Sequence, residues 1–475
     1  MKLHFYGAAR QVTGSLYLLT TDSGYNILID CGQQMSRPKP NDTTQTTSPE
    51  YKPLFPFEPK HIHLVLLTHA HLDHSGRLPL LVREGYEGQI LCTQPTFHLT
   101  HILLHDAAQL FQRRIKRILD KNRNKTKAPE NLEEYYFVKN VEQTLERFVT
   151  IATHQKFKIN DEIAVYFNHA GHLLGAANII ITIKENNTEK KICFSGDIGR
   201  KNYMLLNNPM PIPQVQYLVC ECTYGNRLHT PNLNPADILF QIIKKSCIDK
   251  PGKLIIPAFS VGRTQALLYT LNTLYRDKKI PHIKVYSDSP MAKESSLVYE
   301  KYVKQLNKEA REFFDDEDCL FDFDNYEYVH DVKKSKALTL HSEPCIIVSS
   351  SGMISGGRVE HHINQSLQNP MATILFIGYC AEGTIGHELV NGAKTIKIKE
   401  KNLEVRAQIV VIDCFSAHAD QHGLTEFVLS QDATLLQNIF LTHGEGKAFE
   451  VFQNHLHDKG FHKVTIPEMG QIFEL

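Results

Sequence analysis

The chain of 475 residues is predicted to adopt an α/β fold, and two observations support this. From residue 61 onward, apolar stretches alternate with helical segments, a pattern typical of α/β layers. Examples are the strand–helix pairs 63–68 and 69–85, 253–257 and 258–275, 282–288 and 289–306, and 345–351 and 352–367. The composition, 42% hydrophobic and 22% charged, is that of a folded globular chain and excludes disorder as a whole-chain state.

The remaining elements follow the same reasoning. The opening third is predicted to form short strands at 2–7, 14–21 and 25–32, separated by glycine and polar turns. Residues 33–60, rich in Pro, Thr and Ser, are expected to form a long loop, and residues 99–123 have helical periodicity. Further strands are expected at 162–167, 178–183, 190–194, 372–379, 408–413 and 438–444. In α/β folds, active residues collect at the carboxyl ends of strands.

Composition excludes several classes. No run of about 18 apolar residues exists, so no membrane span is expected. The N-terminal sequence lacks the apolar segment of a secretion signal, and ten scattered cysteines suit reduced thiols, so we expect a cytoplasmic protein. The net charge of zero gives no global attraction to nucleic acid or membrane. A basic run at 113–127 and an acidic run at 309–331 are interpreted as solvated surfaces.

One segment carries a strong chemical signal. Three imidazoles and one carboxylate fall within six residues, directly after the strand at 63–68: His69, His71, Asp73 and His74. A catalytic zinc normally takes three protein ligands and a water, so four candidate ligands in one turn are too many for one ion. The segment therefore predicts two metal ions that share it.

Further ligands are expected at other strand ends. The candidates are His172, with His169 as its competitor, then Asp197 and His443. An aspartate could bridge two cations, and two nearby metals could share a hydroxide and clamp both oxygens of a phosphoryl displacement. Nitrogen-rich ligation favours zinc over magnesium, with manganese or iron as alternatives.

These motifs resemble a known family. The segment 69–74, with Asp30 upstream and His172 and Asp197 downstream, is similar to the metallo-β-lactamase superfamily. That resemblance implies an αββα sandwich with a dinuclear zinc site. Glu221 in ECTYGNR, His418 in FSAHAD and LTHGE at 441–445 resemble three motifs of its β-CASP branch, although Cys222 replaces the usual serine of the first.

The resemblance extends over nearly the whole chain. Residues 257–268, 287–292, 349–358 and 378–386 also resemble β-CASP core segments. β-CASP proteins are nucleases, among them the pre-mRNA 3′-end cleavage subunit and bacterial RNase J, and the similarity is greatest to compact prokaryotic ribonucleases. The implied architecture is a metallo-β-lactamase domain at 1–209 and 396–475, with a β-CASP domain inserted at 210–395 and substrate in the cleft between them.

The resemblance also assigns roles. Two Zn²⁺ ions per chain are implied, with Mn²⁺ as the alternative. One ion would be held by His69, His71 and His172, the other by Asp73, His74 and His443, with Asp197 bridging and Asp30 orienting ligand loops. Glu221 would hold His418, which would protonate the leaving oxygen, and Asp73 is also counted as catalytic.

Phosphate contacts are expected from polar loops that follow strands. The candidates are Arg263, Ser349, Ser350, Ser351 and Ser416, because backbone N–H groups in such loops can hold phosphates. The glycine-rich segment 349–358 could equally be an ordinary strand–helix turn.

The sequence thus predicts a zinc-dependent ribonuclease that cleaves single-stranded RNA. A DNA nuclease of the same branch is the first alternative, but its third motif typically carries valine rather than His443. The inserted domain argues against a small-molecule hydrolase, and the full ligand set argues against a non-catalytic scaffold. No further RNA-binding module is expected after residues 462–466, and a homodimer and the choice between endo- and 5′-exonuclease action are left open.

Overall fold

The computed structural model describes residues 1–34, 54–122, 132–185, 188–230, 234–398 and 401–475. They form two compact units, which we describe separately. The first unit comprises Met1–Lys201, Asn208–Leu228 and His418–Leu475, and the second comprises Asn202–Asn207 and His229–Ala417. Most of the predicted loop at 33–60, and the end of the basic run at 123–127, lie outside the described residues.

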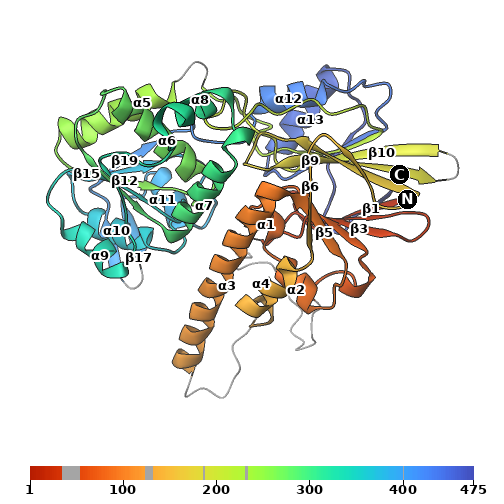
Figure 1. Cartoon of the computed structure of the whole chain (residues 1–475), viewed down its shortest axis with the longest axis horizontal. Coiled ribbons are helices and arrows are strands. Elements are labelled where there is room, and N and C mark those ends of the chain that lie inside the picture. Colours follow the sequence, from red (N-terminus) through yellow and green to blue (C-terminus); the bar gives the residue numbers. More distant parts are fainter. Residues whose placement is uncertain (35–53, 123–131, 186–187, 231–233, 399–400) are drawn as a thin grey trace. The chain divides into compact units, whose positions relative to one another are not determined.

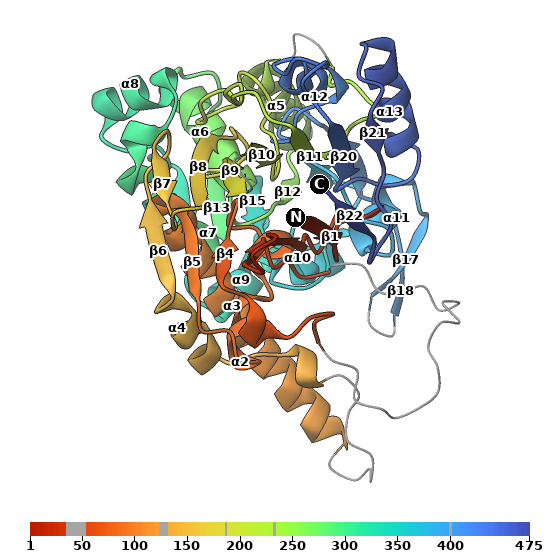
Figure 2. The ribbon, with the colours of Figure 1, turned by 90° about the vertical axis from the view of Figure 1, so that its right-hand side faces the viewer.

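The first unit contains two seven-stranded sheets (Figures 1 and 2). One sheet has the order β22 (Ile472–Glu474), β1 (Lys2–Phe5), β2 (Tyr17–Thr20), β3 (Asn26–Ile29), β4 (Leu64–Leu66), β5 (Gln89–Thr93), β6 (Phe148–Ile151). The other has the order β21 (Val464–Thr465), β20 (Asn438–Thr442), β11 (Tyr217–Glu221), β10 (Thr188–Phe194), β9 (Ala177–Glu185), β8 (Ile163–His169), β7 (Lys156–Lys158).

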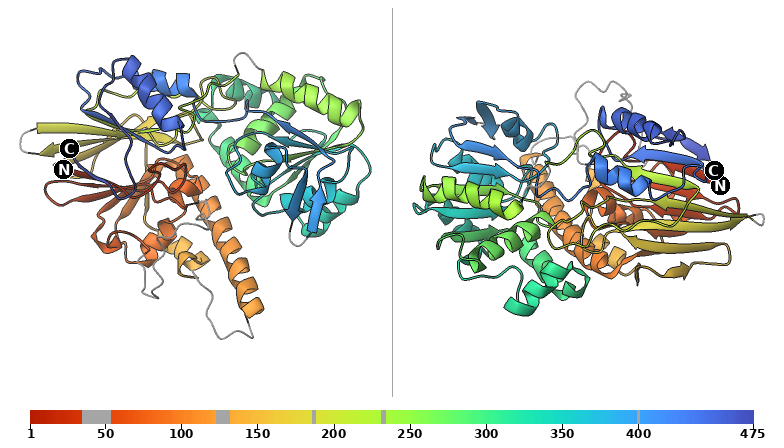
Figure 3. Two further views of the ribbon diagram at one scale, coloured as in Figure 1. Left: turned by 180° about the vertical axis from the view of Figure 1, so that it is seen from behind. Right: turned by 90° about the horizontal axis from the view of Figure 1, so that it is seen from above.

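Successive side chains of a strand point to opposite faces of its sheet, and in these sheets apolar side chains on both faces are buried in hydrophobic cores. Between the sheets, Phe5 and Tyr17 pack against Phe194 and Phe440. The first sheet is covered on its outer face by helices α1 (Leu72–Ser75), α2 (Leu78–Arg83), α3 (Gln94–Asn122) and α4 (Val138–Leu145). Apolar residues of the sheet and of these helices form one hydrophobic core between them. Helices α12 (Gln421–Val428) and α13 (Ala448–Asp458) cover the second sheet. The predicted αββα sandwich is confirmed (Figure 3).

The second unit is built on one parallel sheet. Its order is β14 (Tyr326–Tyr328), β13 (Lys284–Asp288), β15 (Cys345–Ser349), β12 (Lys253–Pro257), β16 (Thr373–Phe376), β19 (Gln408–Val411). The helices are α5 (Pro235–Ile243), α6 (Arg263–Arg276), α7 (Pro290–Lys301), α8 (Lys308–Glu317), α9 (Val332–Leu340), α10 (Val359–Ser366) and α11 (Ile385–Val390), and β17 (Thr395–Ile398) and β18 (Lys401–Glu404) form a hairpin. The inserted α/β domain therefore has the predicted class.

The residues at which the chain passes from one unit to the other are not those of the predicted boundaries, 210 and 395. β11 pairs in parallel with β10 and β20, so residues 208–228 belong to the first unit and, after the short segment 202–207, the main part of the second unit begins at residue 229. β19, predicted to return to the first domain, pairs with β16 of the second unit, which extends to residue 417. Both differences arise because pairing with a strand distant in sequence decides the unit to which a strand belongs.

All ten cysteines are free, and nine of them are buried. Among the described residues, no helix is both long and apolar enough to cross a bilayer.

Candidate metal centre

The candidate ligands gather at one edge of the first unit. β8, β10, β11 and β20 run in the same direction, as do β3 and β4. The carboxyl ends of these strands therefore meet at common sheet edges, as expected for α/β folds. His69 follows β4, His71 precedes α1, Asp73 and His74 lie in α1, His172 follows β8, Asp197 follows β10 and His443 follows β20.

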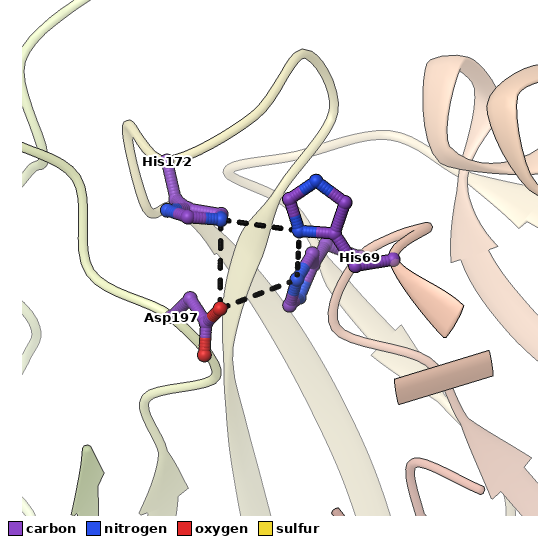
Figure 4. A group of neighbouring side chains, drawn as sticks. His69, His172 and Asp197 are labelled. Atoms are coloured by element: carbon purple, nitrogen blue, oxygen red, sulfur yellow. Dashed lines mark hydrogen bonds and ion pairs between the residues drawn. The ribbon is translucent and has the colours of Figure 1, made fainter. Parts of the chain in front are cut away.

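The first set contains His69, His71, His172 and Asp197, whose ligand atoms lie within 4.8 Å of one another. The Nδ1 atom of His71 is 3.1 Å from His69 Nε2 and 3.3 Å from His172 Nε2. Oδ2 of Asp197 is 3.5 Å from the Nε2 atoms of His69 and His172. Figure 4 shows His69, His172 and Asp197 directed toward one another from separate segments.

The second set contains Asp73, His74 and His443. His443 Nε2 lies 3.6 Å from Asp73 Oδ2, and Oδ1 of Asp197 lies 3.3 Å from His74 Nε2. Asp197 therefore directs Oδ2 to the first set and Oδ1 to the second. This is the arrangement expected of a bridging carboxylate.

The first set fits a tetrahedral ion. Ligand atoms about 2.0–2.2 Å from zinc lie roughly 3.3–3.6 Å from one another at the corners of a tetrahedron. Four of the separations between these ligand atoms, 3.1, 3.3, 3.5 and 3.5 Å, are close to those edges. Asp197 Oδ1 and His443 Nε2 are buried and make no hydrogen bond of good geometry among the described residues, although they lie 3.3 Å from His74 Nε2 and 3.6 Å from Asp73 Oδ2. A cation bound between these atoms would satisfy them. The residues present therefore fit a two-metal site.

Electrostatics separates the two sets. Burial lowers the pKa of His69 and His172 well below its usual value and that of His71 to about 4, so these imidazoles stay neutral and keep a lone pair for a cation. Burial would also lower the pKa of His74, but the carboxylates of Asp197 and Asp30 outweigh it and raise that pKa well above its usual value.

For Asp197, burial and neighbouring charges act on the pKa in the opposite directions to those for His74. Burial would raise its pKa, but His443 and His74 outweigh burial and hold the pKa well below its usual range. The side chains of His69, His74, His172, Asp197 and His443 are at most 5% exposed, whereas Asp73 is 20% exposed and His418 is 14% exposed. His71 is also partly exposed, so the solvent-facing side of the centre is formed by His71, Asp73 and His418.

Asp30 lies where the sequence places a supporting residue. It follows β3 with a left-handed φ of 58°, uncommon for a residue other than glycine. One oxygen accepts the Thr68 N–H at 2.8 Å, and the other accepts the Thr68 hydroxyl at 2.8 Å and His74 Nδ1 at 2.6 Å. Since Thr68 donates its proton to Asp30, its oxygen accepts from His69 Nδ1 at 3.1 Å. Each ring then keeps Nε2 for a cation.

A second carboxylate network holds His418. His418 Nδ1 lies 3.3 Å from Glu221 Oε1, which also accepts the Ile198 N–H at 2.5 Å. Oε2 of Glu221 accepts the backbone N–H and the hydroxyl of Thr223. His418 Nε2 faces Asp197 Oδ2 at 3.9 Å. His418 thus stands at the edge of the ligand cluster with one nitrogen fixed by a buried glutamate.

Close backbone packing sets the position of His172. A Cβ on Gly199 would lie 2.0 Å from the carbonyl carbon of Gly171 and 2.6 Å from the His172 amide nitrogen. The Gly199 N–H donates to Ala170 O at 2.7 Å, and Gly199 also bridges to His418. Only glycine permits this approach, which ties the loop of His172 to the loop of Asp197.

The other predicted residues lie elsewhere. His169, the competitor of His172, ends β8 and belongs to none of the ligand groups among the described residues. Ser349 is 1% exposed and donates to Asp288 O at 3.1 Å, and Ser350 donates to Ser289 Oγ at 3.0 Å. These contacts favour a packing role for Ser349.

The remaining phosphate candidates are also in the second unit. The Arg263 guanidinium lies 4.8 Å over the Phe259 ring at the start of α6. The Ser351 hydroxyl is 3.3 Å from Ser355 Oγ, and Ser416 is 1% exposed. Phosphate binding by these residues stays a prediction.

Comparisons with known proteins agree with this geometry. The family model described as the metallo-beta-lactamase superfamily matches residues 9–250, and the Beta-Casp domain model matches residues 264–389. The model of the Zn-dependent metallo-hydrolase RNA specificity domain matches residues 402–467. The chain belongs to the β-CASP branch of the metallo-β-lactamase superfamily.

Named relatives cover nearly the whole β-CASP chain. A ribonuclease of Thermus thermophilus is 31% identical over 445 residues, 94% of this chain and 93% of the relative. An RNase J-like protein of Methanocaldococcus jannaschii is 30% identical over 432 residues, 90% of this chain and 89% of the relative. The transcription termination factor FttA of Methanosarcina mazei is 31% identical over 93% of this chain and 66% of the relative.

Sequence reasoning missed two residues of this β-CASP centre. Thr68 and Thr223 each donate a hydroxyl proton to a buried carboxylate and face a histidine of the ligand cluster. Thr68 directly precedes His69, which was a usable signal. Thr223 lies 220 residues before its partner His443, so no local pattern could reveal the contact.

Proposed function

We propose that this protein is a zinc-dependent ribonuclease that hydrolyses phosphodiester bonds of single-stranded RNA. The observation that carries the proposal is the division of seven ligand side chains into two sets that share Asp197, with His418 beside them. The matched RNA specificity domain and the ribonuclease relatives support RNA as substrate.

The proposed metal content is two Zn²⁺ ions per chain, with Mn²⁺ as the alternative. His69, His71 and His172 would hold one ion, Asp73, His74 and His443 the other, and Asp197 both. When bound, two such cations activate water as a nucleophile near neutral pH and stabilise charge on both oxygens of a phosphoryl displacement. The free cysteines suit the reducing cytoplasm in which we expect the enzyme to act.

The chain's own residues would supply the proton for the leaving oxygen. His418 Nδ1 lies 3.3 Å from Glu221 Oε1, which fixes the ring orientation and directs Nε2 toward the ligand cluster. Because the His418 side chain is 14% exposed, it can reach a substrate that the buried ligands cannot. A positioned histidine can protonate the departing ribose oxygen as a general acid, and Glu221 would hold its ring in the orientation for this transfer.

Two measurements test the proposal. Elemental analysis of protein purified without chelator should find close to two transition-metal ions per chain. End-labelled RNA and DNA of one sequence, incubated with the metal-loaded protein, should give product ladders for RNA at a much higher rate, and the ladder will distinguish internal from 5′-exonucleolytic cleavage. Metal content well below one per chain, with no activity restored by zinc or manganese, would refute the dinuclear site. Equal rates on RNA and DNA would refute the substrate.

A further inference from the structure

The longest helix of the first unit carries exposed positive charge far from the ligand cluster. α3 has 29 residues, about 43 Å at 1.5 Å per residue. It starts beside the metal loops, because the Thr96 hydroxyl donates to Gly175 O at 2.9 Å in the loop that carries His172. Figures 1 and 2 show that its C-terminal half runs outward from the sheets of this unit.

Four cations lie within five residues of that half: Arg113, Arg114, Lys116 and Arg117. All four are exposed. At about 100° per residue they span roughly 160° of the helix circumference, so they form one basic face. Ile115 and Ile118 lie on the remaining arc and are half-buried. Within the described part of the chain, none of the four forms an ion pair, and Arg114 packs over the Tyr135 ring at 5.6 Å.

We propose that this basic face of α3 binds the phosphate backbone of the same RNA strand that the metal centre cleaves. The proposal rests on the proposed ribonuclease function. Unpaired arginine and lysine side chains on one face suit a polyanion, and they bind phosphates without regard to base sequence. The chain has a net charge of zero, so this attraction is local to α3 rather than a property of the whole protein.

The helix sets the length of RNA required. Thr96 and Arg113 are 17 residues apart, about 26 Å along the axis. A stacked strand rises about 3.4 Å per nucleotide, so roughly eight nucleotides separate the metal loops from the basic face. At this stacked rise a 6-nucleotide RNA is too short to occupy both, whereas a 30-nucleotide RNA can. The basic face should therefore affect long substrates alone.

The test replaces the four cations with glutamine in one variant, R113Q/R114Q/K116Q/R117Q. A matched control removes four exposed lysines elsewhere in the same unit: K156Q/K184Q/K459Q/K463Q. Affinity for an unstructured 30-mer is measured by fluorescence anisotropy at salt concentrations from 50 to 200 mM, with all proteins also carrying His418→Ala to suppress turnover. Cleavage of the 6-mer and the 30-mer is measured in parallel.

Four phosphate contacts on a single strand contribute a salt slope of about −2.8, equivalent to about 50-fold in affinity between 50 and 200 mM salt. We expect the α3 variant to lose a slope of this size and to raise KM on the 30-mer, with the 6-mer cleaved at the wild-type rate and the control variant unchanged. An unchanged slope with active wild-type enzyme would overturn the α3 proposal alone. If the α3 substitutions changed the sedimentation coefficient of the protein but left its RNA affinity unchanged, the proposal would be overturned, because the basic face would then bind a second copy of the chain. A wild-type enzyme inactive on both RNAs would instead refute the proposed function.

Discussion

Replacing Thr223 with valine should weaken one metal position selectively. The Thr223 hydroxyl has a single proton, and both oxygens near it, Glu221 Oε2 and His443 O, can only accept. His443 Nδ1, 3.1 Å away, must therefore donate to Thr223 Oγ1, which leaves Nε2 to face Asp73. Valine has nearly the same shape but no hydroxyl, so the variant removes this constraint with little change in packing.

The magnitude follows from the bonds lost. A hydrogen bond to a charged group contributes about 1.5–3 kcal/mol, and Thr223→Val removes the one between the hydroxyl and the Glu221 carboxylate. It also leaves His443 Nδ1 without its acceptor. Loss of such an outer contact typically costs about 10–100-fold in metal affinity, which corresponds to a similar free energy. We expect this loss at the position that His443 shares with Asp73 and His74.

The assay is stepwise zinc removal by a competing chelator, with bound metal counted by mass spectrometry. Thr223→Val should release one ion at about 10–100-fold lower chelator activity, while the second ion behaves as in the wild type. Thr223→Ser keeps the hydroxyl and should retain both ions. The reasoning is refuted if Thr223→Val binds both ions with wild-type affinity, or if Thr223→Ser loses metal to the same extent.

Three further predictions follow from the centre. His418→Ala should keep both metals and RNA binding but lower turnover by about 10²–10⁴-fold. His443→Ala should instead lower the occupancy of one metal position. Cleavage by His418→Ala at near the wild-type rate would exclude the acid role. Gly199→Ala should destabilise the protein by about 1–3 kcal/mol in urea unfolding, because its Cβ would collide with backbone atoms; a loss below 0.5 kcal/mol would contradict that packing. The metal-free protein should be most stable near pH 6.5. Below that pH the unfolded chain gains a proton that folded His71, with a pKa of about 4, does not; above it, folded His74 retains a proton that the unfolded chain loses. Urea unfolding in chelator from pH 5 to 8 should show a maximum in the free energy of unfolding, and a monotonic trend would contradict the prediction.

The local pattern of residues was sufficient for the fold class and for most of the candidate ligands. His69, His71, Asp73 and His74 occupy one turn after a strand, so adjacency alone brings them together. His172, Asp197 and His443 could be proposed because each follows an apolar strand, and parallel strands deliver their carboxyl ends to one edge. The strand–helix alternation reflects burial on sheet faces, which short segments already encode.

Tertiary structure decided the features that depend on partners distant in sequence. Residues 208–228 lie in the first unit because β11 pairs in parallel with β20, more than 200 residues later. The role of Thr223 depends on His443, which folding brings within 3.1 Å. The Ser349 hydroxyl donates to Asp288 O inside the sheet, and the sequence around Ser349 does not indicate this partner. A hydrogen bond or strand pair of this kind is specified by packing of the whole chain, because its two partners share no local pattern.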